Sequence, residues 1–334
     1  MGIARYTMWR RLANLTVFLV LAAAILPGQE TGQHLLNQDE VYGLIKQDKG
    51  HLDVLEKTLH DQGVDFDLNN DIEKKMRQAG ATDEILQAIW AAGPTVRTFK
   101  GAALMSATGT PLTSTYKEAM GYKTLEETSD PDTKIRMAME FAQTFPKSDL
   151  LSYVFTQAAA AFQQKGDYPN AVKTGQKSVE LDPENAYSLL IVATALSEPS
   201  MVSKAGDNRA KVLPEAQTDA QRVLDLLPKL AIRPGETPEQ LEARKAGIES
   251  SAHAALGSVA MQQDKHDAAI DEFNKAISFS QPPKPFLYFR LGEVYSRAGK
   301  KQEAIQAFSK AAELGRGTVI ETYANQSIKE LQQN

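Results

Sequence analysis

The chain of 334 residues contains no cysteine. This absence excludes disulfide bonds, zinc–thiolate sites, iron–sulfur clusters, a thiol nucleophile and a lipid-modified N-terminal cysteine. A basic excess is also missing, because 37 Lys and Arg face 42 Asp and Glu and the formal net charge is −5. The sequence therefore predicts no nucleic-acid partner. Aromatic side chains make up 7% of the chain and charged ones 24%, which is ordinary for a water-soluble protein of about two domains.

The short motifs that mark common active sites are missing too. No Gly-x-Ser-x-Gly elbow, Gly-x-x-x-x-Gly-Lys phosphate loop or Gly-x-Gly-x-x-Gly fingerprint is present. Residues 65–71 place oxygen-bearing side chains at alternate positions, as an EF-hand loop does. However, Asn70 replaces the turn glycine and Met76 replaces the bidentate glutamate. We therefore predict no catalytic residue, no cofactor and no metal site.

The N-terminus holds an apolar run, residues 12–26, which follows three arginines and no acid. This order is typical of a secretory signal peptide. The run is shorter than the roughly 20 residues that cross a bilayer core, and small residues suit cleavage after Ala24. We predict a signal peptide over residues 1–24, or an uncleaved anchor to about residue 28, and hence an exported protein. The expected location is periplasmic or secreted. The alternative is an inner-membrane anchor, through a tether at residues 12–26, that faces the periplasm.

From residue 34 to residue 93 the chain shows the punctuation of short helices. Asn37 begins a pattern that resembles a capping box, and apolar residues then recur at steps of three and four. Glycines fall where helix C-caps belong, at Gly50, Gly63, Gly80 and Gly93. We predict a small module of four helices over residues 34–93, with Phe66, Leu68 and Trp90 in its centre.

Residues 94–128 are predicted to be a linker. The stretch from Lys100 to Thr115 is rich in Gly, Ala, Ser and Thr, contains Pro111 and shows no periodic apolar pattern.

The C-terminal half of the chain repeats itself. Five residues recur at an offset of 35, since Leu256, Gly257, Ala269, Phe273 and Ala276 are followed by Leu291, Gly292, Ala304, Phe308 and Ala311. The pattern resembles the tetratricopeptide repeat, in which short side chains let two helices cross closely. The resemblance implies an all-α fold, in which helix pairs stack into a superhelix beside the small N-terminal helical module.

The resemblance extends over residues 129–317. The expected repeats are 152–185, 186–229, 250–283 and 285–318, and residues 318–334 are expected to form a C-terminal capping helix. The second of these repeats carries an insertion, residues 198–211, in the turn between its two helices.

A superhelix of this kind has a concave groove lined by the first helix of each repeat, and the resemblance implies that the groove binds peptides. The candidate groove residues are Tyr153, Thr156, Ala160 and Gln163, then Tyr187, Leu190 and Thr194, then Phe286, Phe289, Glu293 and Ser296, with Arg290 as a clamp-like cation. A second interpretation stays open for Phe286 and Phe289, in which they pack in the core against the preceding helix.

The leading hypothesis is an exported, non-enzymatic scaffold that binds a protein or peptide partner in the bacterial cell envelope. The alternative is a small-molecule-binding or catalytic envelope protein. Its site would then lie in the N-terminal module or in the 198–211 insertion. The partner, the oligomeric state and the role of the 34–93 module do not follow from the sequence.

Overall fold

The computed structural model describes residues 34–47, 52–98, 106–109, 112–206, 209–233 and 235–333. In this part of the chain the secondary structure is helical, apart from one isolated bridge between Leu36 and Val64. None of the described helices is long and apolar enough to span a membrane. The predicted signal peptide or anchor, with its apolar run at 12–26, lies outside the described residues.

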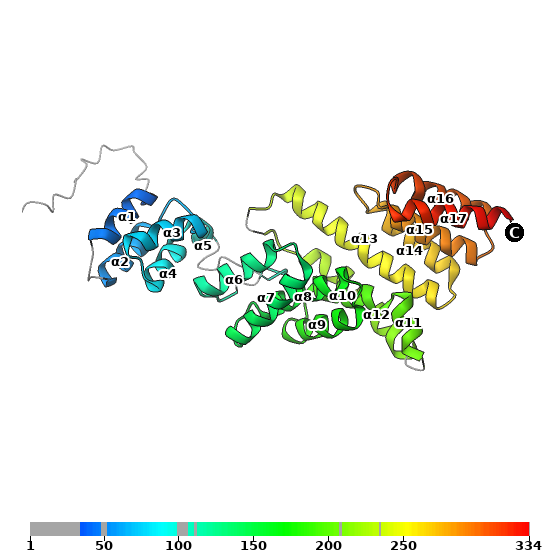
Figure 1. The fold of residues 1–334 in the computed structure, drawn as a ribbon, viewed down its shortest axis with the longest axis horizontal. Coiled ribbons are helices and arrows are strands. Elements are labelled where there is room, and N and C mark those ends of the chain that lie inside the picture. The colour runs from blue at the N-terminus through cyan, green and yellow to red at the C-terminus, as the bar shows by residue number, and fades with distance from the viewer. Residues whose placement is uncertain are drawn as a thin grey trace, which may run out of the picture. The chain divides into compact units, whose positions relative to one another are not determined.

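Short helices form the N-terminal module (Figure 1). They are α1 (Gln38–Gln47), α2 (Leu52–Gln62), α3 (Asn70–Ala79) and α4 (Asp83–Ala92). Asn69 caps the start of α3 by accepting two backbone N–H bonds, and Gly80 ends it with a left-handed φ of 107°. The apolar faces of the four helices share one core, which includes Phe66, Leu68 and Trp90.

The predicted linker over residues 94–128 contains two helices, α5 (Pro94–Thr98) and α6 (Tyr116–Glu127). The prediction of a linker is therefore wrong for residues 116–127. Thr115 and Glu118 form a capping box that begins α6. The first turns of α6 join the core of the N-terminal module, and its last turn joins the core of the next two helices. This double burial stabilises a helix whose flanking sequence is rich in Gly, Ser and Thr.

The remaining helices pack in pairs along the chain (Figure 1). They are α7 (Pro131–Thr144), α8 (Leu151–Gln164), α9 (Tyr168–Leu181), α10 (Ala186–Leu196), α11 (Pro199–Ala205), α12 (Arg209–Leu226), the 3₁₀ turn η2 (Leu227–Lys229), α13 (Pro238–Gln262), α14 (His266–Ser278), α15 (Pro285–Arg297), α16 (Lys301–Leu314) and α17 (Val319–Gln333). The pairs are α8 with α9, α10 with α12, α13 with α14, and α15 with α16, and α17 packs on α16. The expected all-α fold of stacked helix pairs is confirmed. The short helix α11 lies within the insertion 198–211.

Glycines allow the closest helix crossings. A Cβ atom built on Gly292 of α15 would lie 2.7 Å from the ring of Phe308 on α16, and one built on Gly257 of α13 would lie 3.1 Å from Phe273 on α14. Both phenylalanine rings are buried. The glycine and phenylalanine positions of the sequence repeat therefore mark the contact between the two helices of a pair.

The pair α8 and α9 packs differently. Gly175 of α9 stands where α14 and α16 carry their phenylalanine, and Val192 of the following helix α10 fills the space. A Cβ atom on Gly175 would lie 2.7 Å from Val192 Cγ2. Here the glycine admits a side chain from the next repeat instead of one from its own.

Candidate functional site

A cavity of about 780 Å³ lies along the first helices of two successive repeats, α8 and α10. We call it the Tyr153 cavity. Its lining from the two repeats is Leu150, Tyr153, Thr156, Gln157, Ala160, Tyr187, Leu190 and Ile191. Residues of α6, of the N-terminal module and of the connecting segments (Ser106, Ala107, Leu112, Ile232 and Arg233) complete the wall.

Several predicted groove residues meet in this cavity. Tyr153, Thr156 and Ala160 line it from α8, and Tyr187 and Leu190 line it from α10. These residues occupy corresponding positions in the two repeats. The structure thus brings the groove positions of successive repeats together around one hollow.

Tyr153 is held from two sides. Its hydroxyl donates to Asp182 Oδ2 at 2.8 Å and accepts the backbone N–H of Ala107 at 3.3 Å. Burial, followed by the nearby Asp182 carboxylate, raises the pKa of Tyr153 well above its ordinary value. The phenol is therefore a neutral, oriented hydrogen-bonding group on the cavity wall.

Tyr187 is oriented by two arginines. Arg244 Nη1 donates to the Tyr187 hydroxyl at 2.9 Å, and the Arg233 guanidinium lies 5.0 Å from the ring centroid. Arg244 also forms a bidentate pair with Glu236, at 2.7 and 2.8 Å, and donates to the carbonyl of Ala231 at 2.7 Å. The hydrogen bonds from Arg244 hold the pKa of Glu236 down at about 2. This arginine of α13 therefore fixes the loop that forms one rim of the cavity.

Thr156 belongs to a polar cluster beneath the cavity floor. Its Oγ1 lies 2.7 Å from Ser188 Oγ and 3.1 Å from Ser178 Oγ, and it accepts from Asn185 Nδ2 at 3.0 Å. Ser152 joins the cluster through Ser178 and Asn185. All of these side chains have hydrogen-bond partners, so the cluster couples α8, α9 and α10 without an unsatisfied polar group.

Gln163 lies outside the lining of the Tyr153 cavity. Its Nε2 donates to Thr194 Oγ1 at 2.7 Å, which links two predicted groove positions of α8 and α10 to each other.

The predicted residues of α15 form a separate group. Phe286 is 42% exposed, whereas the Phe289 ring lies 5.3 Å from that of Phe308 on α16, within the last hydrophobic cluster. Both phenylalanines were candidate groove residues with a core interpretation left open, and their surroundings differ: Phe289 is packed and Phe286 is exposed. Arg290 pairs with Glu293 at 3.0 Å and with Glu198 of the insertion at 3.4 Å.

The sequence analysis missed one wall of the cavity. Met120 and Tyr122 of α6 and Ile232 and Arg233 of the inter-repeat loop all line it. Burial raises the pKa of Tyr122 to about 12, so this phenol is also neutral at ordinary pH. The capping box at the start of α6 was the signal that could have located the helix.

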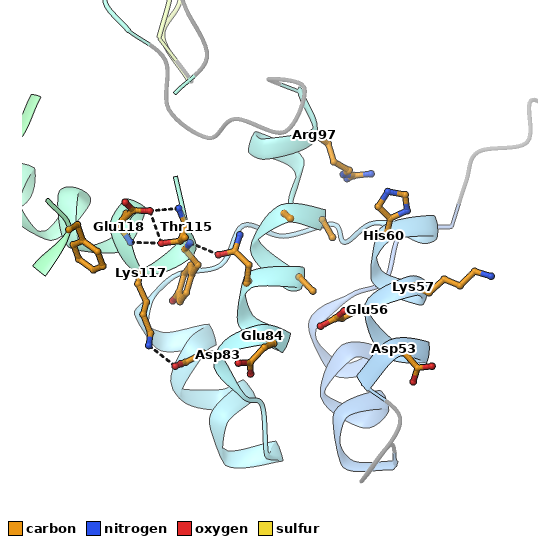
Figure 2. A pocket seen from close by; sticks show the side chains of 16 residues that line it. Asp53, Glu56, Lys57, His60, Asp83, Glu84, Arg97, Thr115, Lys117 and Glu118 are labelled. Atoms are coloured by element: carbon orange, nitrogen blue, oxygen red, sulfur yellow. Dashed lines mark hydrogen bonds and ion pairs between the residues drawn. The ribbon is translucent and has the colours of Figure 1, made fainter. Parts of the chain in front are cut away.

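A second, more open hollow of about 1480 Å³ lies on the N-terminal module between α2 and α4 (Figure 2). Asp53, Glu56, Lys57 and His60 of α2 and Glu84 of α4 line it, so its edge carries charged side chains of both signs. Lys117 of α6 is already paired with Asp83, at 2.6 Å. In the part of the chain that the structure describes, no group of three or more His, Asp or Glu is placed to hold a metal ion.

The family comparison supports the repeat assignment. Two models described as tetratricopeptide repeats match the chain, at residues 250–282 and 285–317. These two segments contain the Gly257–Phe273 and Gly292–Phe308 crossings. No curated protein of similar sequence was found.

Solved structures are similar to this chain at low sequence identity. The APC/C assembly Cut9–Hcn1 matches 88% of this chain and 48% of its own at 14% identity, with a TM-score of 0.50. A thermophilic TPR protein from Thermus thermophilus matches 64% and 97% at 14% identity, with a TM-score of 0.47. MamA matches 59% and 89% at 20% identity, with a TM-score of 0.39. Its two family matches and its stacked helix pairs show that the chain contains tetratricopeptide repeats.

Proposed function

We propose that this protein is a non-enzymatic scaffold that holds an extended segment of a partner protein in the Tyr153 cavity. The main support is that groove positions of two successive repeats, on α8 and α10, face one cavity of about 780 Å³. In a stack of such repeats the first helices form a concave surface, and surfaces of this kind accept peptides.

The side chains that line the cavity indicate the chemistry of the partner segment. Tyr122, Tyr153 and Tyr187 present aromatic faces, and Met120 and Leu190 add apolar surface between them. Rings of this type usually supply most of the binding energy at a protein interface. Charged groups from α6 also line the cavity, at Lys123, Glu126 and Glu127. The cavity thus suits a segment with apolar anchors that also carries polar or charged groups.

The proposed setting is the bacterial cell envelope. The support is the arginine-flanked apolar run at 12–26 followed by small residues, a pattern typical of export. Fractionation of the native cells and mass measurement of the mature N-terminus test this proposal. We expect a chain that begins at Ile25 outside the cytoplasm. A full-length chain in the cytoplasm that keeps residues 1–24 would contradict it.

A small molecule is a second candidate for the same cavity, because its volume falls within the range of about 300–1,000 Å³ typical of small-ligand sites. Native mass spectrometry of the purified protein tests this candidate. A retained mass of a few hundred daltons that disappears on filling the cavity would favour it over a peptide.

The peptide proposal is tested by cross-linking from inside the cavity. A photoreactive amino acid replaces Leu190, and a matched control replaces Lys173, which is exposed on α9 and is not part of the lining. We expect a protein adduct in native cells from position 190 and none from position 173. Adducts of equal yield at the two positions, or none at position 190, would refute the cavity as the binding site.

A substitution then links the adduct to the cavity. Ala160 is exposed and lines the hollow, so Ala160→Trp should fill space without disturbing the core. We expect the variant to keep its melting temperature and to weaken partner binding by about tenfold or more, whereas the control Lys173→Trp should leave both unchanged.

A further inference from the structure

The segment Ser106–Gly109 lies at the edge of the Tyr153 cavity. Ser106 and Ala107 line the hollow, and Ala107 packs, as Tyr187 and Leu190 do, against the buried cluster that contains Leu189. The segment comes from the region whose composition predicts a linker. One wall of the proposed binding site is therefore a piece of the chain outside the repeats.

The contacts of the segment are those of a bound peptide. The N–H group of Ala107 donates to the Tyr153 hydroxyl at 3.3 Å, and its carbonyl accepts from the N–H group of Ala231 at 2.9 Å. Both backbone groups of one residue thus bond to elements far along the chain. Main-chain hydrogen bonds supply affinity in one of the known modes of peptide recognition.

The segment forms a tight turn from Ser106 to Gly109. The N–H group of Gly109 donates to the carbonyl of Ser106 at 3.0 Å, and Gly109 has a φ of +84°, which favours glycine. A Cβ atom on Gly109 would lie 3.0 Å from Ala231 Cβ. Small side chains are therefore required where the segment passes the loop.

The two groups that bond to Ala107, the Tyr153 hydroxyl and the Ala231 N–H group, are held in place by residues outside the segment. Asp182 accepts from Tyr153, and Arg244 donates to the carbonyl of Ala231 while it is paired with Glu236. The hydroxyl of Tyr153 and the N–H group of Ala231 are thus oriented by partners outside the segment. The same pair of groups can hold another backbone of similar shape.

The segment Ser106–Gly109 buries no large side chain. Its side chains are small, and all four of its residues are only partly buried. Its two long-range backbone hydrogen bonds and the hydrogen bond between the Ser106 side chain and Tyr153 lie at the edge of a cavity. Each such bond contributes little net stability, so a competing segment can replace them.

We propose that Ser106–Gly109 is a tethered competitor of the partner segment, and that the partner displaces it by pairing its own backbone with Tyr153 and Ala231. The inference rests on the proposed function of the cavity. It also defines the ligand class, a peptide stretch that turns as residues 106–109 do and carries Gly, Ala or Ser where it passes Ala231. Such a competitor reduces the affinity of the cavity for the partner, because the partner binds only during the fraction of time in which the segment is released. A segment that is bound nine-tenths of the time weakens binding about tenfold.

The test uses variants of the full chain that release the segment. Gly109→Val is expected to open it, because valine disfavours the positive φ and would press on Ala231. Ala107→Pro removes the N–H group that Tyr153 accepts, and provides a second route to the same state. Thr108→Ser is the matched control, since it keeps the hydroxyl near Ser106 and both backbone bonds of Ala107.

The probe is a fluorescein-labelled synthetic peptide with the sequence of residues 104–113, followed by fluorescence anisotropy. We expect it to bind Gly109→Val and Ala107→Pro about tenfold or more tightly than the unaltered chain and Thr108→Ser. Hydrogen exchange of the peptide fragment that contains Ala231 should also become faster in the two releasing variants. Equal affinity for all four proteins, or unchanged exchange at Ala231, would overturn the proposal.

The cross-link from position 190 separates this inference from the function on which it rests. A partner adduct of the same yield with and without Gly109→Val refutes the competitor but leaves the binding site standing. Loss of the adduct in both chains refutes the binding site, while the labelled peptide still reports on the segment. A global loss of melting temperature in both releasing variants, with no peptide binding, would show that the segment is only a structural part of the wall.

Discussion

Gly292→Ala is expected to destabilise the last repeat, although alanine normally strengthens a helix. A Cβ atom at this position would lie 2.7, 2.8 and 2.9 Å from three ring atoms of Phe308. That ring is 2% exposed, and the Phe289 ring packs on it with a centroid distance of 5.3 Å. Because Phe308 is enclosed, the added methyl group forces the two helices α15 and α16 apart.

The magnitude follows from two opposing effects. Alanine in place of glycine inside a helix is worth about 1 kcal/mol in favour of folding. Overpacking a close crossing costs about 1–3 kcal/mol. The net change in the free energy of unfolding is then a loss of up to about 2 kcal/mol. Gly247→Ala is the matched control, because Gly247 lies inside α13 with no atom within 4 Å of its built Cβ, and this variant should gain about 0.5–1 kcal/mol.

The assay is equilibrium urea unfolding followed by circular dichroism, with hydrogen exchange of the amides of α15 and α16. The local probe is needed because a stack of repeats opens in parts. A double-mutant cycle with Phe308→Leu isolates the contact, and we expect a coupling of about 1 kcal/mol or more, since leucine removes the ring that clashes. If Gly292→Ala stabilised the chain as much as Gly247→Ala does, the glycine crossing would be the wrong explanation of the repeat.

Further predictions concern packing and pH. Phe289→Ala should lower the free energy of unfolding by about 2–3 kcal/mol because its ring is packed. Phe286→Ala should change it by less than about 0.5 kcal/mol. Thermal melting in which Phe286→Ala is the less stable variant would contradict this prediction. Ala304→Trp should cost about 3 kcal/mol or more, because Ala304 is fully buried, and an unchanged melting curve would argue against the close crossing. Arg244 holds the pKa of Glu236 at about 2 against an ordinary 4.5, so the carboxylate stabilises the fold above pH 4.5 and this contribution is lost as the pH falls towards 2. Glu236→Gln should therefore flatten the dependence of melting temperature on pH in this acid range, and an unchanged slope would refute the role of the pair.

Local patterns were enough to predict the C-terminal repeats. Gly257 meets Phe273 and Gly292 meets Phe308 inside a single repeat, so these residues must recur at a regular spacing for the helices to cross closely. Helix ends could be predicted because they, too, depend on local patterns of residues. Thr237 and the residues directly after it form the capping box that begins the long helix α13, and capping depends only on neighbours along the chain.

The floor of the Tyr153 cavity could also be predicted, because the repeat register places Tyr153 and Tyr187 on the same side of their helices. The walls of the cavity could not be predicted. Ala107 bonds to Tyr153 across 46 residues, and Arg244 bonds to Tyr187 across 57. No local spacing specifies such pairs.

Helix α6 and the side chains of α15 show the same limit. The sequence around α6 has the composition of a linker, yet the helix is stable because both of its ends are buried, in different cores. Phe286 and Phe289 share one helix face by spacing. Phe289 is packed because side chains of α16 and α17 surround it, whereas Phe286 in the first turn remains exposed. Which residue of a stripe is buried depends on the neighbouring helices, and their placement is a property of the whole stack.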